Sequence, residues 1–490
     1  MLVSALQKYE PKDFTGLVTE NHLGAIFATE PILASKLIES IYQVNVGQDI
    51  VSYMDKFPTV YLEDDRPYQW MLQGADEKNT PLLAWGDSSL TAITYPGLAN
   101  SRFFMKFGEK LFTVTDVIVG HKPELYKLRI TGEQSDGAGN WIYEVELLTG
   151  DVTLFIPSDE LAAGTRWSKD YSIVTQTLSK QGGETYHTSP FRMENVMSMI
   201  RKQYTVPGNM IVKGQNAPLA FSFRTQDGTT HTQWIKKLDY DFMMQFRREK
   251  ARLLAYGTSN RRSDGSYGNT DTNGFEIRSG AGLYEQISPS NIFFYNSFDL
   301  DYMTQIALGL SVGKLPEDKR EFVLSTGEYG MFQFHKAASE KASLFTPNFT
   351  SDRIQMTGKN TMTYRGQFLK YMSVNGIEFT LMHDPMKDDP IRNKIMHPDG
   401  GLASSYEYTI MDFGTANGNP NIQKVAVKGN EEMFRYIPGM RDPYSPYNNL
   451  TQPGVAASSV DGYEVHRAYI GGVKVTNPMR MARVMPSLLA

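Results

Sequence analysis

Apolar residues recur at steps of three and four along residues 237–256, at Leu238, Phe242, Phe246 and Leu253. This spacing places them on one face and predicts an amphipathic helix. Asp239 is placed to cap its start, and Gly257 to end it as a left-handed residue. A loop rich in Gly, Asn, Asp and Ser follows through residue 279. A long loop carried by a helix is typical of a contact element, which is how we interpret this segment.

Three further helices are predicted. Thr29 precedes Glu30 and Pro31, a cap followed by Pro in the first turn, and an apolar face continues through residue 41. A second helix is predicted over residues 190–204 and a third near residues 329–343. Residues 1–24 show no sustained period and are expected to lie extended against another surface.

Residues 57–174 have a pattern typical of β-strands. The clearest hairpin pairs residues 126–130 with residues 141–148, because apolar residues alternate in both and the connection is rich in turn formers. Residues of about 100–175 are predicted to form a small barrel or sandwich inserted into a larger domain. Residues 461–490 are predicted to form two strands. The fold class is α+β.

Composition narrows the classes of function. Lys and Arg total 49 against 54 Asp and Glu, a net charge of −5, whereas a protein that grips phosphate backbones over a broad face is basic. The chain has no cysteine, which excludes disulfide scaffolds, cysteine nucleophiles and thiolate metal sites. No segment approaches the roughly 20 apolar residues of a membrane helix, and no secretory signal is visible. We therefore expect a protein made inside a cell, with no membrane partner.

Binding motifs for calcium and nucleotides are incomplete. The loop matches the first half of an EF-hand from Asn269 to Gly274, but Gly280 stands where the bidentate Glu belongs. Gly280 and Gly282 begin a dinucleotide fingerprint that lacks its third Gly and its preceding strand. We therefore expect no cofactor.

One acidic cluster is a candidate for chemistry. His383, Asp384, Asp388 and Asp389 could hold a hard cation or supply general acid and base. Their spacing matches no known ligand pattern, and the prolines among them favour a polar turn. Asp384, Asp388 and Asp389 are the metal candidates, and the absence of a catalytic signature elsewhere favours a protein that is not an enzyme.

Several longer stretches carry a family resemblance. These are FRREKARLLAYGTSNR at 246–261, GAGLYEQISPSN at 280–291, FVLSTGEYGMFQFHKAASEKA at 322–342, GIEFTLMHDPMKDDPIRNK at 376–394 and DGYEVHRAYIGGVKVTNP at 461–478. With them the chain resembles the major capsid proteins of tailed bacteriophages, most closely those of the crAss-like phages. The resemblance covers residues of about 190–490 and extends to the first 190 only by the order of elements.

The resemblance implies the Hong Kong 97 capsid fold. It assigns residues 1–55 to an N-arm and 56–235 to an extended E-loop region that contains the β-rich insertion. Residues 236–320 would be the peripheral domain, with 237–256 as its spine helix. Residues 321–440 would be the axial domain, and 441–490 would return to the peripheral domain.

The implied function is structural. The chain would self-assemble into hexamers and pentamers of an icosahedral shell that encloses the phage genome, as part of a virion assembled in the bacterial host cytoplasm. Its partners would be other copies of itself, portal, decoration or auxiliary capsid proteins, and genomic double-stranded DNA held non-specifically on the inner face. Five arginines are candidates for contacts with carboxylates of a neighbouring copy: Arg247, Arg248, Arg252, Arg261 and Arg262.

Two alternatives stay open at this point. One is another virion structural protein, such as a portal, tail or adaptor protein, although portals are usually more helical. The other is a metal-dependent hydrolase that acts through His383, Asp384, Asp388 and Asp389.

Overall fold

The computed structural model describes residues 37–38, 49–74, 77–177, 184–185, 187–208, 211, 222–224, 230–231, 234–315, 319–344, 370–372, 376–416, 419–442 and 457–489. Strands and a smaller number of helices are mixed along the chain, which confirms the expected combination of α and β structure. The chain divides into two compact units. Residues 71–193 form the barrel unit, and residues 1–70 with 194–490 form the large unit.

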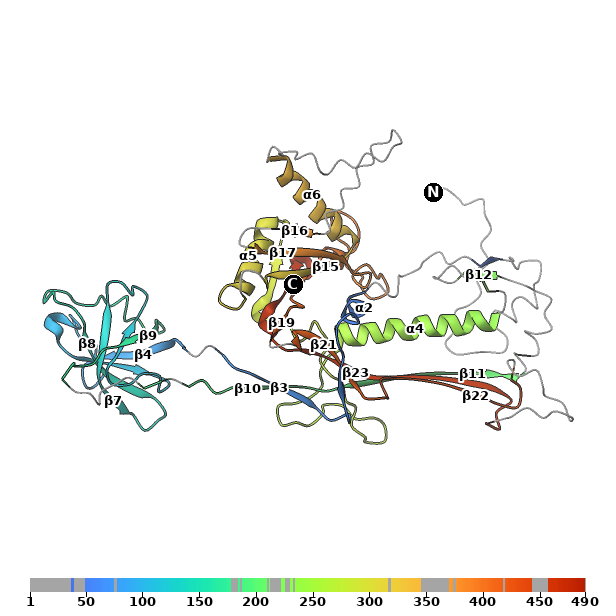
Figure 1. The fold of residues 1–490 in the computed structure, drawn as a ribbon, viewed down its shortest axis with the longest axis horizontal. Coiled ribbons are helices and arrows are strands. Elements are labelled where there is room, and N and C mark those ends of the chain that lie inside the picture. The colour runs from blue at the N-terminus through green and yellow to red at the C-terminus, as the bar shows by residue number, and fades with distance from the viewer. Residues whose placement is uncertain are drawn as a thin grey trace. The chain divides into compact units, whose positions relative to one another are not determined.

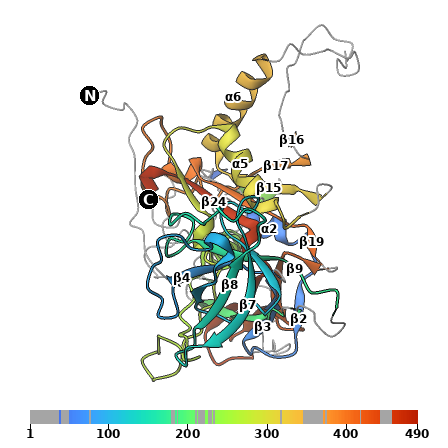
Figure 2. The same ribbon diagram turned by 90° about the vertical axis from the view of Figure 1, so that its left-hand side faces the viewer.

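The barrel unit is a closed barrel of six strands in the order β4-β5-β8-β7-β6-β9 (Figure 2). The strands are β4 (Thr80–Gly86), β5 (Phe103–Phe107), β6 (Asp116–Val119), β7 (Lys127–Ser135), β8 (Trp141–Leu147) and β9 (Arg166–Ser172). The predicted hairpin is confirmed, because β7 and β8 pair antiparallel from Leu128 opposite Leu147 to Ser135 opposite Trp141. Alternate residues point inward, so the interior is filled by side chains such as Phe103, Tyr143 and Trp167.

A long sheet lies in the large unit, with the strand order β11-β23-β21-β2 and β22 paired to β23. Its strands are β2 (Val60–Leu62), β11 (Ser198–Pro207), β21 (Ile422–Val427), β22 (Glu432–Pro438) and β23 (Gly462–Val475). Upstream of β11, β10 (Phe191–Asn195) pairs with β3 (Tyr68–Leu72).

The helix predicted over residues 190–204 is therefore wrong. β11 pairs with β23 at every residue from Ser198 to Pro207, and burial alternates along it, with Met199 57% exposed and Ile200 half-buried. The pattern of apolar residues fits the period of a helix and that of a strand. The backbone hydrogen bonds available from β23 favour the strand.

A second sheet in the large unit has the order β14-β24-β18-β15-β17-β16. Its strands are β14 (Ile292–Tyr295), β15 (Glu321–Thr326), β16 (Lys370–Met372), β17 (Glu378–His383), β18 (Tyr408–Met411) and β24 (Met481–Pro486). Helices α5 (Leu300–Ser311) and α6 (Glu328–Leu344) pack with it around a common apolar core. The helix predicted near residues 329–343 is confirmed by α6, and the two strands predicted at 461–490 by β23 and β24.

Helix α4 (Trp234–Tyr256) runs alongside β11, β22 and β23 (Figure 1). It begins three residues before the predicted start, so Asp239 lies inside the helix and the prediction of an N-cap there is wrong. Gly257 follows the last helical residue as expected, but its φ is not positive. A Cβ at this position would lie 2.5 Å from the Leu253 carbonyl oxygen, so close approach of backbone, and not a left-handed turn, requires the glycine.

Short elements complete the described fold. Asp49 caps the start of helix α2 (Ile50–Met54), because its carboxylate accepts a hydrogen bond of 2.8 Å from the Ser52 amide. The small sheets are β1 (Leu37–Ile38) with β12 (Ser222–Arg224) and β13 (Thr230–His231), and β19 (Thr415–Ala416) with β20 (Asn419–Pro420). Single 3₁₀ turns are η1 (Leu98–Asn100), η2 (Pro289–Asn291), η6 (Ala403–Tyr406), η7 (Pro478–Arg480) and η8 (Ser487–Leu489).

The helix predicted after Thr29 is contradicted at Leu37–Ile38, which pair with β12 as a parallel strand. The remainder of that prediction, and the extended segment 1–24, lie outside the described residues. The β-branched Ile38 is compatible with either state, so backbone pairing decides.

Candidate functional site

The loop after α4 is internally braced. The Asn260 side chain donates to the carbonyl oxygen of Ile277 (2.7 Å) and accepts from the Ser279 amide (3.0 Å), which joins the two ends of the loop. Two isolated β-bridges, Arg261 with Tyr267 and Thr270 with Glu276, divide it into two small lobes. Phe275 is 72% exposed and Ile277 47% exposed. A braced loop that displays apolar side chains is suited to contact with another protein.

Glycines fix the root of this loop. The Gly282 amide donates to the Gly257 carbonyl oxygen at 2.7 Å. A Cβ on Gly280 would lie 1.9 Å from the carbonyl oxygen of Val196, which precedes β11. The Asn195 side chain spans the same junction, donating to the carbonyl oxygens of Ala281 and Val473 at 3.0 Å each. The glycines that resemble a nucleotide fingerprint therefore permit close backbone packing between the end of α4, the loop and the segment that precedes β11.

The five candidate arginines divide into two groups. Arg252 pairs with Asp389 and Arg261 with Glu194, each at 2.5 Å, so both already have carboxylate partners in their own chain. Arg247 and Arg262 are exposed and Arg248 is half-buried, and none of the three forms an ion pair with another residue that the structure describes. Contact with a neighbouring copy stays a prediction for all five.

The three metal candidates are separated by the fold. Asp388 accepts hydrogen bonds from the Glu328 amide (3.0 Å) at the start of α6 and lies 2.8 Å from His383 Nε2, which raises the pKa of His383. Asp389 pairs with Arg252. Asp384 is fully buried, accepts from Tyr284 at 3.2 Å, and burial raises its pKa to about 6.

The carboxylate of Asp388 therefore caps α6, that of Asp389 forms an ion pair, and that of Asp384 accepts a buried hydrogen bond. Among the residues that the structure describes, no three His, Cys, Asp or Glu side chains are arranged to hold a metal ion. The polar-turn interpretation of this segment fits the geometry, because neighbours on a tight turn point in different directions.

A buried ion network in the second sheet was missed by sequence reasoning. Lys387 donates to the carbonyl oxygens of Ser325 and Glu407 and to Thr409 Oγ1, at 2.9–3.1 Å. Arg483 holds the Glu407 carboxylate with two parallel bonds of 2.8 and 2.9 Å. Burial opposes ionisation of Glu407, but the adjacent Lys387 and Arg483 bring its pKa below the usual value. The available signal was a charge in or directly before an apolar strand, at Arg483 in MARVMP and at Glu407 before YTIM.

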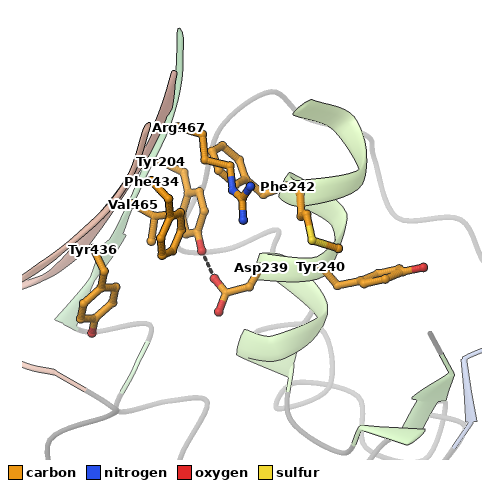
Figure 3. Close-up of a pocket in the computed structure, with 9 residues that line it drawn as sticks. Tyr204, Asp239, Tyr240, Phe242, Phe434, Tyr436, Val465 and Arg467 are labelled. Carbon is orange, nitrogen blue, oxygen red and sulfur yellow. Dashed lines mark hydrogen bonds between the residues drawn. The ribbon is translucent and has the colours of Figure 1, made fainter. Parts of the chain in front are cut away.

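A cleft of about 430 Å³ lies between α4 and strands β11, β22 and β23. Figure 3 shows the side chains that line it. The Tyr204 hydroxyl donates to the Asp239 carboxylate, and the Arg467 guanidinium lies 4.7 Å from the centroid of the Phe434 ring. The remaining lining is Tyr240, Phe242, Met243, Tyr436 and Val465. This lining suits an apolar side chain, and its residues include no nucleophile–base pair.

No helix in the described part of the chain is both long and apolar enough to span a membrane.

Comparison with known proteins gives matches over nearly the whole chain. A family model described as Crassvirus major capsid protein matches residues 1–489. The chain is 34% identical over 495 residues, covering 97% of its length and 96% of the relative, to the "Major capsid protein" of Bacteroides phage crAss001. Among solved structures, that titled for Microbacterium phage Oxtober96 matches with a TM-score of 0.36 and 9% identity over 94% of this chain and 98% of that one. The capsid of Myoviridae phage XM1 matches with a TM-score of 0.36 and 8% identity over 92% and 96%.

Proposed function

The chain belongs to the Crassvirus major capsid protein family, and on that premise we propose that it adopts the Hong Kong 97 capsid fold and tiles an icosahedral shell as hexamers and pentamers. The observation that carries this proposal is the match to the family and to the crAss001 protein over nearly the whole chain. As a major capsid protein it is a structural component of the virion.

The expected domains can be matched to elements of the fold. We propose that α4 is the spine helix of the peripheral domain (236–320) and that the barrel unit is the insertion within the E-loop region (56–235). The axial domain (321–440) would be built on β15, β17, β18 and α6, around an apolar core that includes Phe322, Leu324 and Phe379. Residues 1–55 would be the N-arm. The C-terminal segment (441–490) adds β23 to the long sheet and β24 to the second sheet, which ties the proposed domains together.

The contacts with other molecules follow from the same premise. In the proposed shell, carboxylates of a neighbouring copy pair with Arg247, Arg248 and Arg262. The guanidinium groups of Arg252 and Arg261 already pair with carboxylates of their own chain, and a neighbouring carboxylate would share them. The inner face contacts double-stranded DNA non-specifically. A net charge of −5 suits a wall that must contain DNA without trapping it. Portal, decoration or auxiliary proteins complete the particle, which assembles in the host cytoplasm.

Sedimentation and negative-stain electron microscopy of the expressed full-length protein test the proposal. We expect closed shells of uniform size, alone or on co-expression with the other virion proteins. Rings of a single size would point to a portal or adaptor protein. Monomers that persist even with virion partners would contradict assembly.

A further inference from the structure

The second lobe of the loop after α4 is exposed at every residue and is negatively charged. This lobe, residues 270–277, is closed by the bridge between Thr270 and Glu276. Its charged residues are Asp271 and Glu276, and its apolar side chains are Phe275 (72% exposed) and Ile277 (47%). We call residues 270–277 the acidic lobe.

Hydrogen bonds hold the acidic lobe in one shape. The Asp271 carboxylate accepts the amides of Asn273 (2.9 Å) and Phe275 (2.8 Å), and the Ile277 amide donates to the Asn269 carbonyl oxygen at 3.0 Å. The bond from the Phe275 amide lowers the pKa of Asp271, so this carboxylate is charged at neutral pH. A partner therefore meets a preformed surface, and little conformational entropy is lost on contact.

The connection from β17 to η6 carries a second exposed surface, of the opposite charge. Residues 390–396 display Ile391 (59% exposed), Ile395 (51%) and Met396 (64%). The charged residues among them are Arg392 and Lys394, both exposed. We call residues 390–396 the basic loop.

The basic loop is also braced. The Asn393 side chain donates to the Met386 carbonyl oxygen at 3.1 Å, and the Ala403 amide donates to that of Ile395 at 2.8 Å. The Arg392 guanidinium lies over the ring of Tyr256 at the end of α4, 3.4 Å from the ring centroid. This surface is therefore preformed as well.

Carboxylates next to the basic loop leave its positive charge in place. Each of three faces a cation or a histidine of its own chain: Asp388 faces His383, Asp389 faces Arg252 and Asp399 faces His397. The exposed carboxylate of Glu328, at the start of α6, can offset at most one of the two cations. Lys394 forms no ion pair with another residue that the structure describes.

Cations next to the acidic lobe likewise leave its negative charge in place. Arg278 pairs with Asp65 at 3.2 Å. In the first lobe of the same loop, Arg262 stands against the carboxylate of Asp264 in the charge balance. Glu276 forms no ion pair with another residue in the described part of the chain. The acidic lobe and the basic loop are therefore complementary in charge, and both add apolar side chains.

The two surfaces do not cover each other within one copy, because Phe275 and Met396 remain 72% and 64% exposed. Both segments are braced, so neither is expected to swing onto the other. A second copy, however, supplies the complement of each surface. Two different patches that join copies of one chain make a head-to-tail contact, which closes into a ring when the rotation allows.

We propose that the acidic lobe of one copy docks on the basic loop of the next copy, head to tail around each ring of the assembled shell. Phe275 and Ile277 then pack against the apolar side chains of the basic loop, and the lobe's carboxylates face Arg392 and Lys394. This inference rests on the proposed function, since the rings are those of the proposed hexamers and pentamers. Both surfaces are smaller than the roughly 20–30 residues a side of a stable interface, so this contact acts together with others between neighbours.

The absence of cysteine permits a direct test with the double variant Phe275→Cys/Met396→Cys. After mild oxidation of assembled particles, we expect most of the monomer band to be replaced by a ladder of covalently joined chains that ends at the pentamer and the hexamer. Each single variant carries only one of the two thiols and should stay monomeric. The matched control is Phe275→Cys/Val312→Cys, because Val312 at the end of α5 is exposed to a similar extent (61%).

A disulfide needs Cα atoms about 4.4–6.8 Å apart, so Ile277→Cys/Ile395→Cys is tested beside the first pair. If particles form and neither pair gives more joined chains than the control, the proposal is overturned. Dimers formed equally by a single variant would indicate a two-fold contact and would also overturn it.

Charge reversal provides a second readout. Particles of Glu276→Lys, and those of Lys394→Glu, should disassemble at a lower urea concentration than unmodified particles. The combined variant Glu276→Lys/Lys394→Glu should recover most of that loss, and the absence of recovery would overturn the pairing. Loss of a different virion protein from Glu276→Lys particles, with unchanged disassembly, would assign the acidic lobe to that protein and overturn the proposal. Failure of the unmodified chain to form any particle contradicts the proposed function instead.

Discussion

Strands in the barrel unit pair mostly with partners that lie close in the sequence, whereas strands in the large unit pair across most of the chain. β7 and β8 are joined by one short turn. In the large unit, β2 pairs in parallel with β21 so that Val60 lies opposite Val425, and β11 pairs with β23 so that Ser198 lies opposite Gly471. Local pairing costs less chain entropy, so the barrel can form from its own segment, while the large unit requires both ends of the chain.

The interiors of the barrel unit and the large unit also differ in the charged residues that they bury. In the barrel, the buried charged residues among those described are two carboxylates, Asp116 at the start of β6 and Glu160 in the connection from β8 to β9. Each accepts a hydrogen bond from a backbone amide. The large unit also buries cations, including Lys387 and Arg480. Substitutions in the barrel, which buries few charges and pairs strands close in sequence, should differ in effect from substitutions in the large unit, which buries cations and pairs distant strands. Four predictions test that difference.

The largest effect is expected for Gly280→Ala in the large unit. The added Cβ would lie 1.9 Å from the Val196 carbonyl oxygen, so backbone must move at the root of the loop. We expect a loss of about 3–5 kcal/mol in the free energy of unfolding of this unit. Urea titration with pulsed hydrogen exchange and mass spectrometry measures each unit separately. Gly309→Ala is the control: it lies in α5 with open space around it and should stabilise by about 0.5–1 kcal/mol. Equal effects of the two changes would contradict the close-packing account.

Lys387→Met tests the buried ion network. Removing the ammonium leaves the carbonyl oxygens of Ser325 and Glu407 and the hydroxyl of Thr409 without their shared donor. The large unit should lose about 3–5 kcal/mol, and the same exchange experiment reads out β15 and β18. Lys370→Met removes an ion pair to Glu378 whose lysine is 67% exposed, and should cost far less, because water screens an exposed ion pair. A loss as small as that of the control would show that the network does not stabilise the fold.

Asp384 should give the large unit a specific pH dependence. Burial raises its pKa from 3.8 to about 6, so the folded state holds the proton more tightly than the unfolded state. The stability that this provides is fully present below the unfolded pKa and is lost as the pH rises through the folded pKa. Between about pH 4 and pH 7 the unmodified protein should lose about 2 kcal/mol relative to Asp384→Asn. Urea titrations at each pH, with the hydrogen-exchange pulse applied at one fixed pH, measure the difference in the free energy of unfolding between the two proteins. Parallel pH profiles of the two proteins would refute it.

The smallest effect is expected in the barrel. Tyr143→Phe removes the hydroxyl that accepts the amides of Leu111 and Phe112 at 3.2 and 3.3 Å, and leaves both donors buried. The cost should be about 1–3 kcal/mol and confined to exchange in residues 71–193. An equal loss of protection in α4 would contradict the independence of the two units.

The same contrast explains which elements were predictable. The β7–β8 hairpin carries its alternation and its turn within one short segment, so the sequence was sufficient to predict it. Residues 190–204 carry apolar positions that fit a helix or a strand, and the deciding partner, β23, lies far away in the chain. The chosen state therefore depends on tertiary pairing, which local periodicity does not encode.

The candidate site shows that the sequence did not predict the partners of individual side chains. Asp384, Asp388 and Asp389 lie close in sequence, but they bond to Tyr284, the start of α6 and Arg252, respectively. Their divergence depends on elements brought together by the fold. The mixed α and β class and the family were accessible from the sequence, whereas the partners of individual charges were not.

A cryo-electron-microscopy reconstruction of an assembled particle tests the central claim most directly, namely that this chain tiles a shell with its axial domain around the symmetry axes. The account predicts a closed icosahedral shell in which residues 321–440 lie nearest the five-fold and six-fold axes, and residues 237–256 lie toward the periphery of each cluster. A closed shell with residues 321–440 at the outer edge of the clusters, or an open ring in place of a shell, would contradict it.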